Sequence, residues 1–394
     1  MKLRKSHKND ADITLSNSII LYFIILPLSY VLKLKFGTIA LFTYPILYLL
    51  LIFKYRKFLL HKKYFFYIFG FFLIASLYSL LGYYYYTYNW FGLMYLFFIT
   101  TLPWLLVSLN INDFSSIITC FKKKSTLIFL SNIILLFYCI KSERNMYGNM
   151  EISYSILPLG IFSFYVFMND KNLKNLFYFL LSFIIIVAVG SRGPLVCILL
   201  YILAFMLLNA KKHKILTLAG FGLILFITLN FQSIVLQTIK IFEEYNIPSR
   251  TLYKIIEEDF ADGTGRTNIY EVTFDLLNNH PVLGVGLGVE RITINYVFNN
   301  MEKDMSSCYP HNIILEILVQ FGYFIGLTII FFIIFVIYKA FSKSNLLEKN
   351  VLIIFGIMEG VRLMISSSYL LSPVIFMFFG FCLKKAFIEE EIKK

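Results

Sequence analysis

The chain has 394 residues, of which 59% are hydrophobic and only 15% are charged, and its mean hydropathy is +0.74. These values exclude an ordinary soluble protein of two or three domains, because apolar runs near the roughly 20 residues that cross a bilayer recur along the chain. The net charge of +13 would favour nucleic acid as a partner of a soluble protein, but Lys and Arg also accumulate on the cytoplasmic side of membrane proteins. We therefore expect one integral membrane domain over residues 1–394, embedded in a lipid bilayer, with no nucleic-acid partner.

Apolar segments predict an all-α transmembrane bundle of about 12 spanning helices. They cover residues 13–32, 37–53, 64–82, 90–109, 125–141, 152–168, 175–190, 194–210, 214–232, 312–338, 350–367 and 369–384. The N-terminus is basic and leads into a full-length span, so no cleavable signal peptide is expected. Basic clusters such as Lys122–Lys124 fall in alternate connections, while the remaining short connections hold few positive residues. This asymmetry predicts cytoplasmic termini and one large extracytoplasmic loop, residues 233–311.

The large loop carries its own structural signals. Ile269, Val272 and Leu276 keep helical spacing, and the run ends before Pro281, which predicts a short amphipathic helix from about 266 to 279. The sequence GVGLG at 284–288 then predicts a tight, flexible stretch. It is no nucleotide fingerprint, because neither a preceding strand nor a βαβ unit accompanies it.

An aromatic run precedes the fourth predicted span. Tyr83–Tyr86, Tyr88 and Trp90 fall at the outer boundary, where an interfacial aromatic belt is the usual interpretation. Stacking on sugar rings is the alternative.

Several motifs are absent from the sequence. The five cysteines are scattered, so they form neither a CxxC metal pattern nor a disulfide framework. No DxD-like pair occurs in the outer segments, and the chain lacks a P-loop, HExxH and GxSxG. We expect neither a metal nor a cofactor, which disfavours a metal-dependent glycosyltransferase.

Basic groups on the predicted outer face are the most informative chemistry. Arg192 follows a span in VGSRGP, Arg266 opens the predicted loop helix in GTGRTN, and Arg291 follows the glycines in GVERI. Residues 233–310 hold 6 Lys/Arg against 11 Asp/Glu. The segment is therefore acidic overall, and these arginines are not part of a generally positive surface. The guanidinium fork suits phosphate oxygens, and a helix N-terminus at Arg266 also favours an anion. The alternative for each arginine is snorkelling or pairing with a carboxylate.

His311 stands at the start of a predicted span, in YPHNIILEI. An imidazole titrates near working pH and can act as a general base; a capping or interfacial histidine is the alternative. His280, beside Pro281 at the end of the predicted loop helix, is interpreted as structural.

Glu359 and Arg362 lie three residues apart inside a predicted span. Charges at membrane depth are expensive and are usually paired. A structural ion pair is the first interpretation, and ion coupling in a transporter is the functional alternative.

Three segments together resemble the O-antigen ligase and O-antigen polymerase family. They are SRGP at 191–194, GRTNIYEVTFDLLNNHPVLGVGLG at 265–288 and HNIILEILVQFGYFIGL at 311–327, and the resemblance covers roughly residues 180–330. Members are polytopic membrane glycosyltransferases of the bacterial plasma membrane that use undecaprenyl-diphosphate-linked oligosaccharides as donors, without a catalytic metal.

The resemblance implies roles for particular residues. Arg192 and Arg266 would bind the diphosphate leaving group, and His311 would activate the acceptor hydroxyl. Arg291, Tyr270 and Asn312 are expected to contact the substrate. A chain-length regulator and a flippase of the same pathway are expected partners.

Three functions stay open at this point. A polymerase joining repeat units into O-antigen or capsular polysaccharide is preferred, because the Phe-, Ile- and Tyr-rich composition is typical of proteins from surface-polysaccharide clusters. A ligase transferring finished polysaccharide to a lipid or protein acceptor is the alternative within the family. A flippase of lipid-linked oligosaccharide is the alternative from another class, but it should concentrate charge within the spans.

Overall fold

The computed structural model describes residues 2–36, 62–82, 88–141, 150–189, 192–211, 266–299 and 308–388, with a few single positions between 212 and 265. All secondary structure in these ranges is helical, as the composition predicts. The elements are α1 (Lys2–Phe36), α3 (Lys62–Gly82), α4 (Tyr88–Leu96), the π-helical turn η2 (Phe97–Thr101), α5 (Pro103–Leu109), α6 (Ser115–Lys141), α7 (Met150–Asp170), α8 (Leu173–Val189), α9 (Arg192–Leu208), α13 (Arg266–Asn279), α14 (Glu290–Asn299), α15 (Ile313–Lys343), α16 (Leu346–Ile365), the 3₁₀ turn η4 (Tyr369–Leu371), α17 (Pro373–Leu383) and the π-helical turn η5 (Lys384–Ile388).

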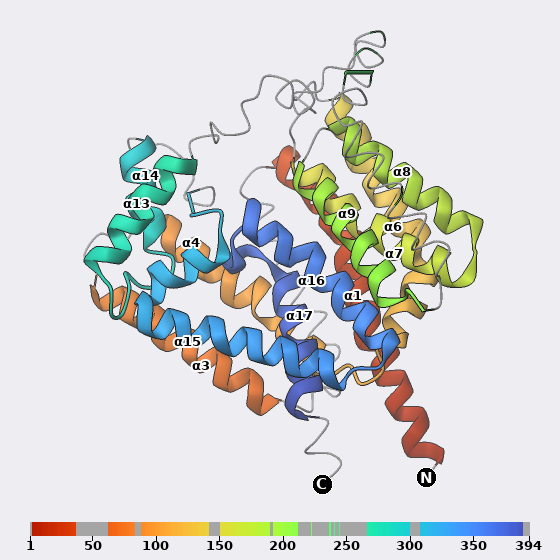
Figure 1. Ribbon diagram of the computed structural model, residues 1–394, viewed down its shortest axis with the longest axis horizontal. Coiled ribbons are helices and arrows are strands. Elements are labelled where there is room, and N and C mark those ends of the chain that lie inside the picture. The colour runs from red at the N-terminus through yellow and green to blue at the C-terminus, as the bar shows by residue number, and fades with distance from the viewer. Residues whose placement is uncertain are drawn as a thin grey trace.

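The described helices form two groups with a central pair between them (Figure 1). Helices α1, α6, α7, α8 and α9 pack together on one side, and α3, α4, α13, α14 and α15 lie on the other. Helix α16 packs against α9, while α17 packs against α5 and α15. The non-helical residues between α16 and α17 therefore lie where the two groups meet.

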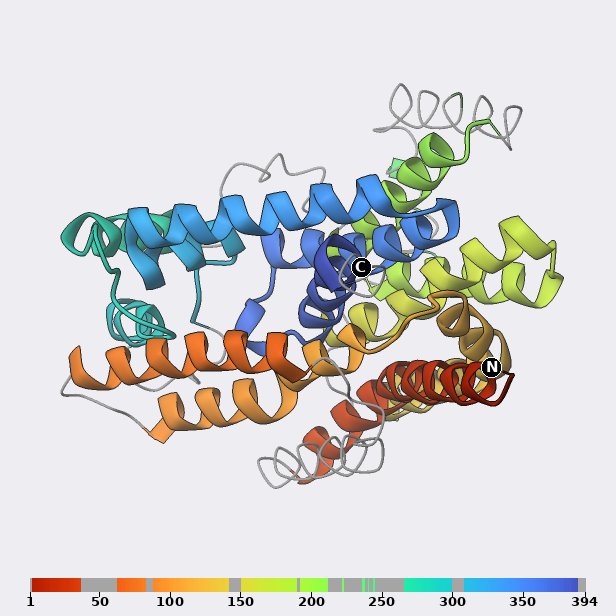
Figure 2. The same ribbon diagram turned by 90° about the horizontal axis from the view of Figure 1, so that it is seen from below.

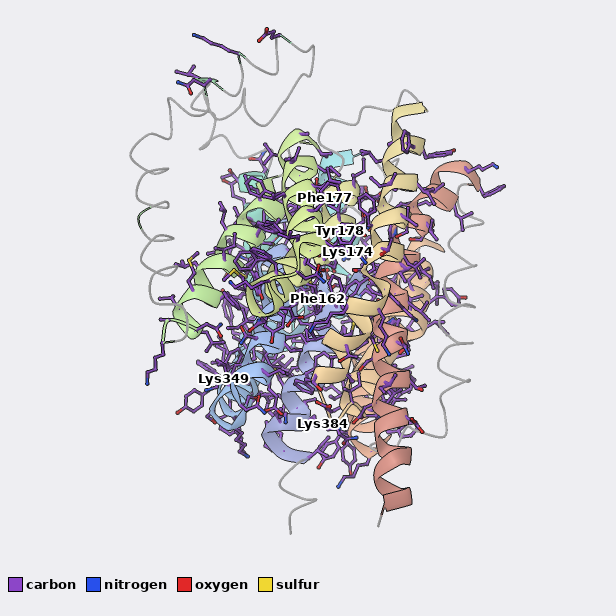
Figure 3. The ribbon with its side chains drawn as sticks, turned by 90° about the vertical axis from the view of Figure 1, so that its right-hand side faces the viewer. Phe162, Lys174, Phe177, Tyr178, Lys349 and Lys384 are labelled. Carbon is purple, nitrogen blue, oxygen red and sulfur yellow. The ribbon has the colours of Figure 1, made fainter. Side chains whose placement is uncertain are left out.

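Aromatic side chains fill the core between these helices. The rings of Phe121 and Phe162 stack with centroids 5.0 Å apart, Phe162 meets Phe355 edge-on at 5.9 Å, and Phe355 meets Phe381 at 5.1 Å. Phe162 lies inside the mass of side chains in Figure 3. These contacts tie α6, α7, α16 and α17 together, and each such pair adds about 1 kcal/mol beyond simple burial.

Large apolar side chains also cover the outside. Phe66 and Tyr67 on α3 are 61% and 72% exposed, and Phe324 and Phe331 on α15 are 77% and 66% exposed. Exposed apolar surface on this scale is unfavourable in water, whereas it is the normal surface of a helix in lipid.

Helices cover most of the predicted spans that fall within the described residues, but the number of spans stays a prediction. Five helical segments are long and apolar enough to cross a membrane: Asp10–Lys33, Lys63–Leu80, Trp90–Leu109, Met150–Asp170 and Ile313–Lys343. Shorter apolar helices occupy Leu173–Val189 and Gly193–Leu208. The predicted spans 37–53 and 214–232 lie outside the described residues, as does most of the first part of the predicted large loop.

Two ends of the bundle can be distinguished. The α7–α8 and α15–α16 connections lie toward one end, and α13 and α14 lie toward the opposite end (Figure 1), and the same separation is visible from below (Figure 2). Figure 3 faces the first end, where Lys174 of α8 and Lys349 of α16 are labelled. This arrangement agrees with the alternation of predicted connections. Which end faces the cytoplasm stays a prediction.

Helix α15 is broken in a way that hydropathy did not predict. Gly322 has φ 73° and ψ 174°, which is not helical. A Cβ added at Gly326 would lie 3.1 Å from Leu318 Cα, eight residues earlier, although eight residues of straight helix span about 12 Å. Residues 313–321 therefore fold back on residues 323–343. The segment predicted as one span over 312–338 is a helical hairpin, and only its second arm is a long continuous helix.

Candidate active site

The glycine run 284–288 forms a buried turn next to the candidate site. Gly284, Gly286 and Gly288 have φ of 70°, 98° and 72°, a region that favours glycine. A Cβ at Gly284 would lie 2.5 Å from the Gln320 backbone, and one at Gly286 would lie 2.6 Å from Ser79 Oγ. The run is tight, as predicted. It is not the flexible stretch that the sequence predicted, because it is packed against α3 and the α15 hairpin.

Hydrogen bonds lock this turn to its neighbours. Val285 N donates to Val319 O at 2.9 Å, and Gly286 N donates to Gln320 O at 3.0 Å. Trp90 Nε1 donates to Leu287 O at 3.0 Å, and its side chain is only 2% exposed. The belt interpretation of Trp90 was therefore wrong, because a buried indole satisfying a backbone carbonyl cannot sit at a lipid interface. Tyr83–Tyr86 lie outside the described residues, so their roles stay a prediction.

A buried polar network follows directly from the turn. Arg291 is fully buried and pairs with Glu316 (Nη2 to Oε1, 3.4 Å) and with Glu290 (Nε to Oε1, 3.7 Å). Glu316 also accepts a hydrogen bond from Ser368 Oγ at 2.5 Å, and Glu290 accepts one from the Gln320 amide at 2.8 Å. Tyr369 donates to Gln320 Oε1. Arg291 is thus held inside the protein by carboxylates, where it joins α14 to the first arm of α15.

Two buried carboxylates share one arginine in this network. Burial raises the pKa of Glu290 to about 8, and the neighbouring Glu316 carboxylate adds to that rise, while Arg291 and Gln320 lower the pKa in part. Glu290 is therefore mostly protonated at neutral pH, which lowers the cost of enclosing both groups.

Tyr309 contacts this network through Arg291, and His311 contacts Tyr309. The Tyr309 ring has the Arg291 guanidinium 5.1 Å from its centroid and the His311 ring 4.2 Å from it. The Tyr309 hydroxyl donates to Ser366 O at 2.7 Å. His311 has a φ of 54°, a conformation that non-glycine residues adopt mainly where surrounding contacts impose it.

Asn312 begins the first arm of α15. Its side chain accepts hydrogen bonds from Ile314 N at 2.9 Å and Leu315 N at 3.3 Å, which satisfies two free N–H groups of the helix end. Asn312 therefore fixes the backbone next to His311, and its contact with substrate stays a prediction.

Arg192 is the first residue of α9, and the next residue places that helix end at the site. A Cβ added at Gly193 would overlap the Tyr154 hydroxyl and lie 3.8 Å from Ser366 Oγ. Tyr154 Oη and Ser366 Oγ are 2.7 Å apart and hydrogen-bonded. The backbone at Arg192 and the Tyr309–His311 segment therefore meet at one residue, Ser366, although they are more than 100 positions apart in the chain.

Arg266 opens α13, whose bounds agree with the predicted helix. The contacts of α13 with the core include Leu277, which clusters with Val285, Val289 and Val319. Arg266 lies at the other end of α13, about 16 Å along the helix at 1.5 Å per residue. The described contacts do not bring Arg266 to His311. Tyr270 is half-buried in the same helix.

Glu359 and Arg362 form the predicted ion pair within α16. Arg362 Nη1 lies 3.6 Å from Glu359 Oε2, and the guanidinium lies over the Tyr154 ring, 4.5 Å from its centroid. Tyr154 thus contacts Arg362 on its face and Ser366 at its hydroxyl. Among the described residues, no group of three or more His, Cys, Asp or Glu side chains is placed to hold a metal ion.

Comparison with known families bears on this part of the chain. Residues 177–331 match the family model of the O-antigen ligases. The resemblance expected from the sequence is thereby confirmed over that region. No curated protein and no solved structure matches the chain.

The region of O-antigen ligase similarity holds Arg192, Arg266, Arg291 and His311, while Tyr154, Arg362 and Ser366 lie outside it. The match points to a glycosyltransferase-like membrane enzyme of polysaccharide assembly and does not separate polymerase from ligase.

The sequence interpretation missed several residues that build the site. Tyr309, Tyr154 and Ser366 carry no charge and match no motif. Glu316 and Gln320 could have been found, since a charge and an amide in the apolar run HNIILEILVQ are expensive at membrane depth unless they are paired.

Proposed function

We propose that the protein is a polymerase of undecaprenyl-diphosphate-linked oligosaccharide repeat units in the plasma membrane. The observation that carries the proposal is the meeting of two segments at Ser366: the start of α9, with Arg192, and the segment with Tyr309 and His311. Both belong to the region of O-antigen ligase similarity. The shared contact at Ser366 supports a site in which His311 is the base and Arg192, at the start of α9, binds phosphate.

In the proposed reaction an acceptor sugar hydroxyl attacks the anomeric carbon of the donor. The new glycosidic C–O bond forms as the bond from that carbon to the diphosphate oxygen breaks, and polyprenyl diphosphate leaves. His311 takes the proton of the attacking hydroxyl. Arg192 and Arg266 stabilise the negative charge that develops on the leaving group, so the chemistry needs no metal or cofactor.

The other substrate-binding assignments take different parts in this proposal. Tyr270 and Asn312 are assigned to the acceptor side. Arg291 instead acts through Tyr309, because its guanidinium is held by the buried side chains of Glu290 and Glu316. The pathway's flippase and chain-length regulator are the proposed protein partners.

A ligase would use the same chemistry, so the two are separated by product. Deletion in the native strain followed by sizing of the surface glycan distinguishes them. One repeat unit on the usual acceptor supports a polymerase. Long polymer stranded on undecaprenyl diphosphate indicates a ligase, and repeat units confined to the inner leaflet indicate a flippase.

Single variants test the site within the same strain. Arg192→Ala, Arg266→Ala and His311→Ala should each abolish polymer while the protein remains in the membrane. Long-chain polysaccharide of normal length in all three would contradict the assignment.

A further inference from the structure

We propose that Arg362 binds a phosphate group of the lipid-linked donor, with Tyr154 holding its guanidinium in place. This rests on the proposed function and adds a third arginine to it, from a helix outside the region of family similarity. Arg362 is more than the partner of Glu359.

The ion pair with Glu359 is open on one side. The Arg362 side chain is 23% exposed, whereas that of Glu359 is 3% exposed. Within the membrane domain, an arginine that keeps this much free surface faces a space that water or a ligand can reach. The guanidinium lies 3.6 Å from Glu359 and also hydrogen-bonds with the Tyr30 side chain. A guanidinium has five N–H donors, so these two contacts leave others for a further acceptor.

The bonding at the pair is incomplete among the described residues. Arg362 Nε and Glu359 Oε1 are buried atoms without a hydrogen-bond partner there. A buried N–H left in this state costs free energy and calls for an explanation. An anion that bridges the guanidinium would satisfy the donor.

Tyr154 fixes where that anion would lie. Its ring carries the Arg362 guanidinium 4.5 Å from the centroid, an attractive arrangement that also orients the planar fork. The Tyr154 hydroxyl bonds to Ser366 and abuts Gly193 in the first turn of α9. Arg362 is thus one side chain away from a helix N-terminus, where free N–H groups favour an anion.

The ligand that suits this arrangement is a phosphate on a lipid. Glu359 balances Arg362 when the site is empty, and a phosphate with two or three free oxygens can share the fork with Glu359 while contacting the α9 end. A neutral sugar carries no charge, so its hydrogen bonds to the guanidinium would be weaker than those of a phosphate.

The test measures binding of undecaprenyl diphosphate to the purified full-length protein in detergent, with undecaprenol as the uncharged reference. Arg362→Gln should weaken diphosphate binding at least tenfold. Glu359→Gln should bind as tightly as wild type or more tightly, and the double variant should behave like Arg362→Gln. The control variant Lys174→Gln removes a cation at the α7–α8 end of the bundle, and it should bind undecaprenyl diphosphate as tightly as wild type.

A purely structural pair gives a different pattern. Equal losses in Arg362→Gln and Glu359→Gln, with recovery in the double variant, would overturn the proposal, as would unchanged binding by Arg362→Gln. If Arg362→Gln alone does not fold, the double variant, which leaves no orphan charge, decides by the same tenfold criterion. Wild-type protein that binds undecaprenyl diphosphate no better than undecaprenol would instead contradict the donor class in the proposed function.

Discussion

Tyr309 is held by two contacts at its ring and one at its hydroxyl. Arg291 lies 5.1 Å and His311 4.2 Å from the ring centroid, and the hydroxyl donates to Ser366 O. Arg291 is itself held by Glu290 and Glu316. The buried network therefore positions the Tyr309 ring, and that ring positions the imidazole of His311. Tyr309 is a positioning residue for His311 in the proposed reaction.

Removing parts of Tyr309 should slow glycan transfer in steps. Tyr309→Phe keeps the ring contacts and loses one hydrogen bond of about 1 kcal/mol, which corresponds to a roughly fivefold slower rate. Tyr309→Ala also frees the His311 ring, so the rate should fall by a further order of magnitude and its dependence on pH should shift. Rates and pH profiles of purified variants check this; a Tyr309→Ala variant with wild-type values for both would contradict the positioning role.

Glu290 should make stability depend on pH. Its pKa is about 8 in the folded protein against about 4.3 in an unfolded chain, so the folded state holds the proton more tightly. The stabilisation is present below about pH 4.3 and is lost as the pH rises through 8. Glu290→Gln should flatten the fall in thermal-unfolding midpoint between these pH values. An equally steep fall in Glu290→Gln would mean that another group is responsible.

For single residues, the sequence indicated which charged side chains matter more reliably than it indicated which residues they contact. The pairing of Glu359 with Arg362 follows from helical spacing, so it was predictable. Arg291 meets Glu316 only because the chain returns 25 residues later, and no local pattern encodes that contact. Ser366 became visible as a centre only through long-range contacts.

The hairpin at Gly322 is the element that brings the site together. Its first arm carries Glu316 and Gln320 back into the bundle, and the glycine run 284–288 packs against the turn. The segment 312–338 is as apolar as a membrane span requires, so hydropathy predicted one span. Hydropathy contains no information about backbone direction, so it could not predict that the chain reverses at Gly322. The loop helix at 266–279 was predictable because amphipathic spacing and Pro281 are local signals.

Gly322→Ala should destabilise the fold. A Cβ at Gly322 would overlap the Val282 carbonyl and lie 2.8 Å from Gly284 N, and φ of 73° is itself unfavourable for alanine. We expect a loss of about 2 kcal/mol or more in stability, seen as a lower unfolding midpoint in detergent.

The matched control for that variant is Gly92→Ala. Gly92 lies in α4, and a Cβ there meets nothing within 4 Å, so alanine should be neutral or stabilise the helix by up to about 1 kcal/mol. If the two variants unfold at the same temperature, the close packing at Gly322 is not what holds the hairpin.

For the whole molecule, hydropathy predicted an all-helical bundle, because alternating apolar runs and basic connections are read directly from composition. It could not predict the two helix groups with α16 and α17 between them, since that arrangement depends on aromatic contacts such as Phe162 with Phe355. The number of spans also depends on segments 37–53 and 214–232, outside the described residues.

Cysteine labelling tests the predicted orientation. The five native cysteines are all buried thiols, so background labelling should be low. Asp275→Cys in α13 should react with a membrane-impermeant maleimide in intact cells, whereas Lys174→Cys in the first turn of α8 should react only after permeabilisation. Both residues are exposed, and α13 and the α7–α8 connection lie toward opposite ends (Figure 1). Labelling of both from the same side would contradict the topology.

The most direct test of the proposed reaction is release of polyprenyl diphosphate by the purified protein. A polyprenyl-diphosphate-linked oligosaccharide is supplied as both donor and acceptor, in chelator, and free polyprenyl diphosphate and glycan length are measured together. We predict one polyprenyl diphosphate released for each repeat unit added, with neither product formed by His311→Ala. Glycan lengthening without that release, or equal release by His311→Ala, would contradict the account.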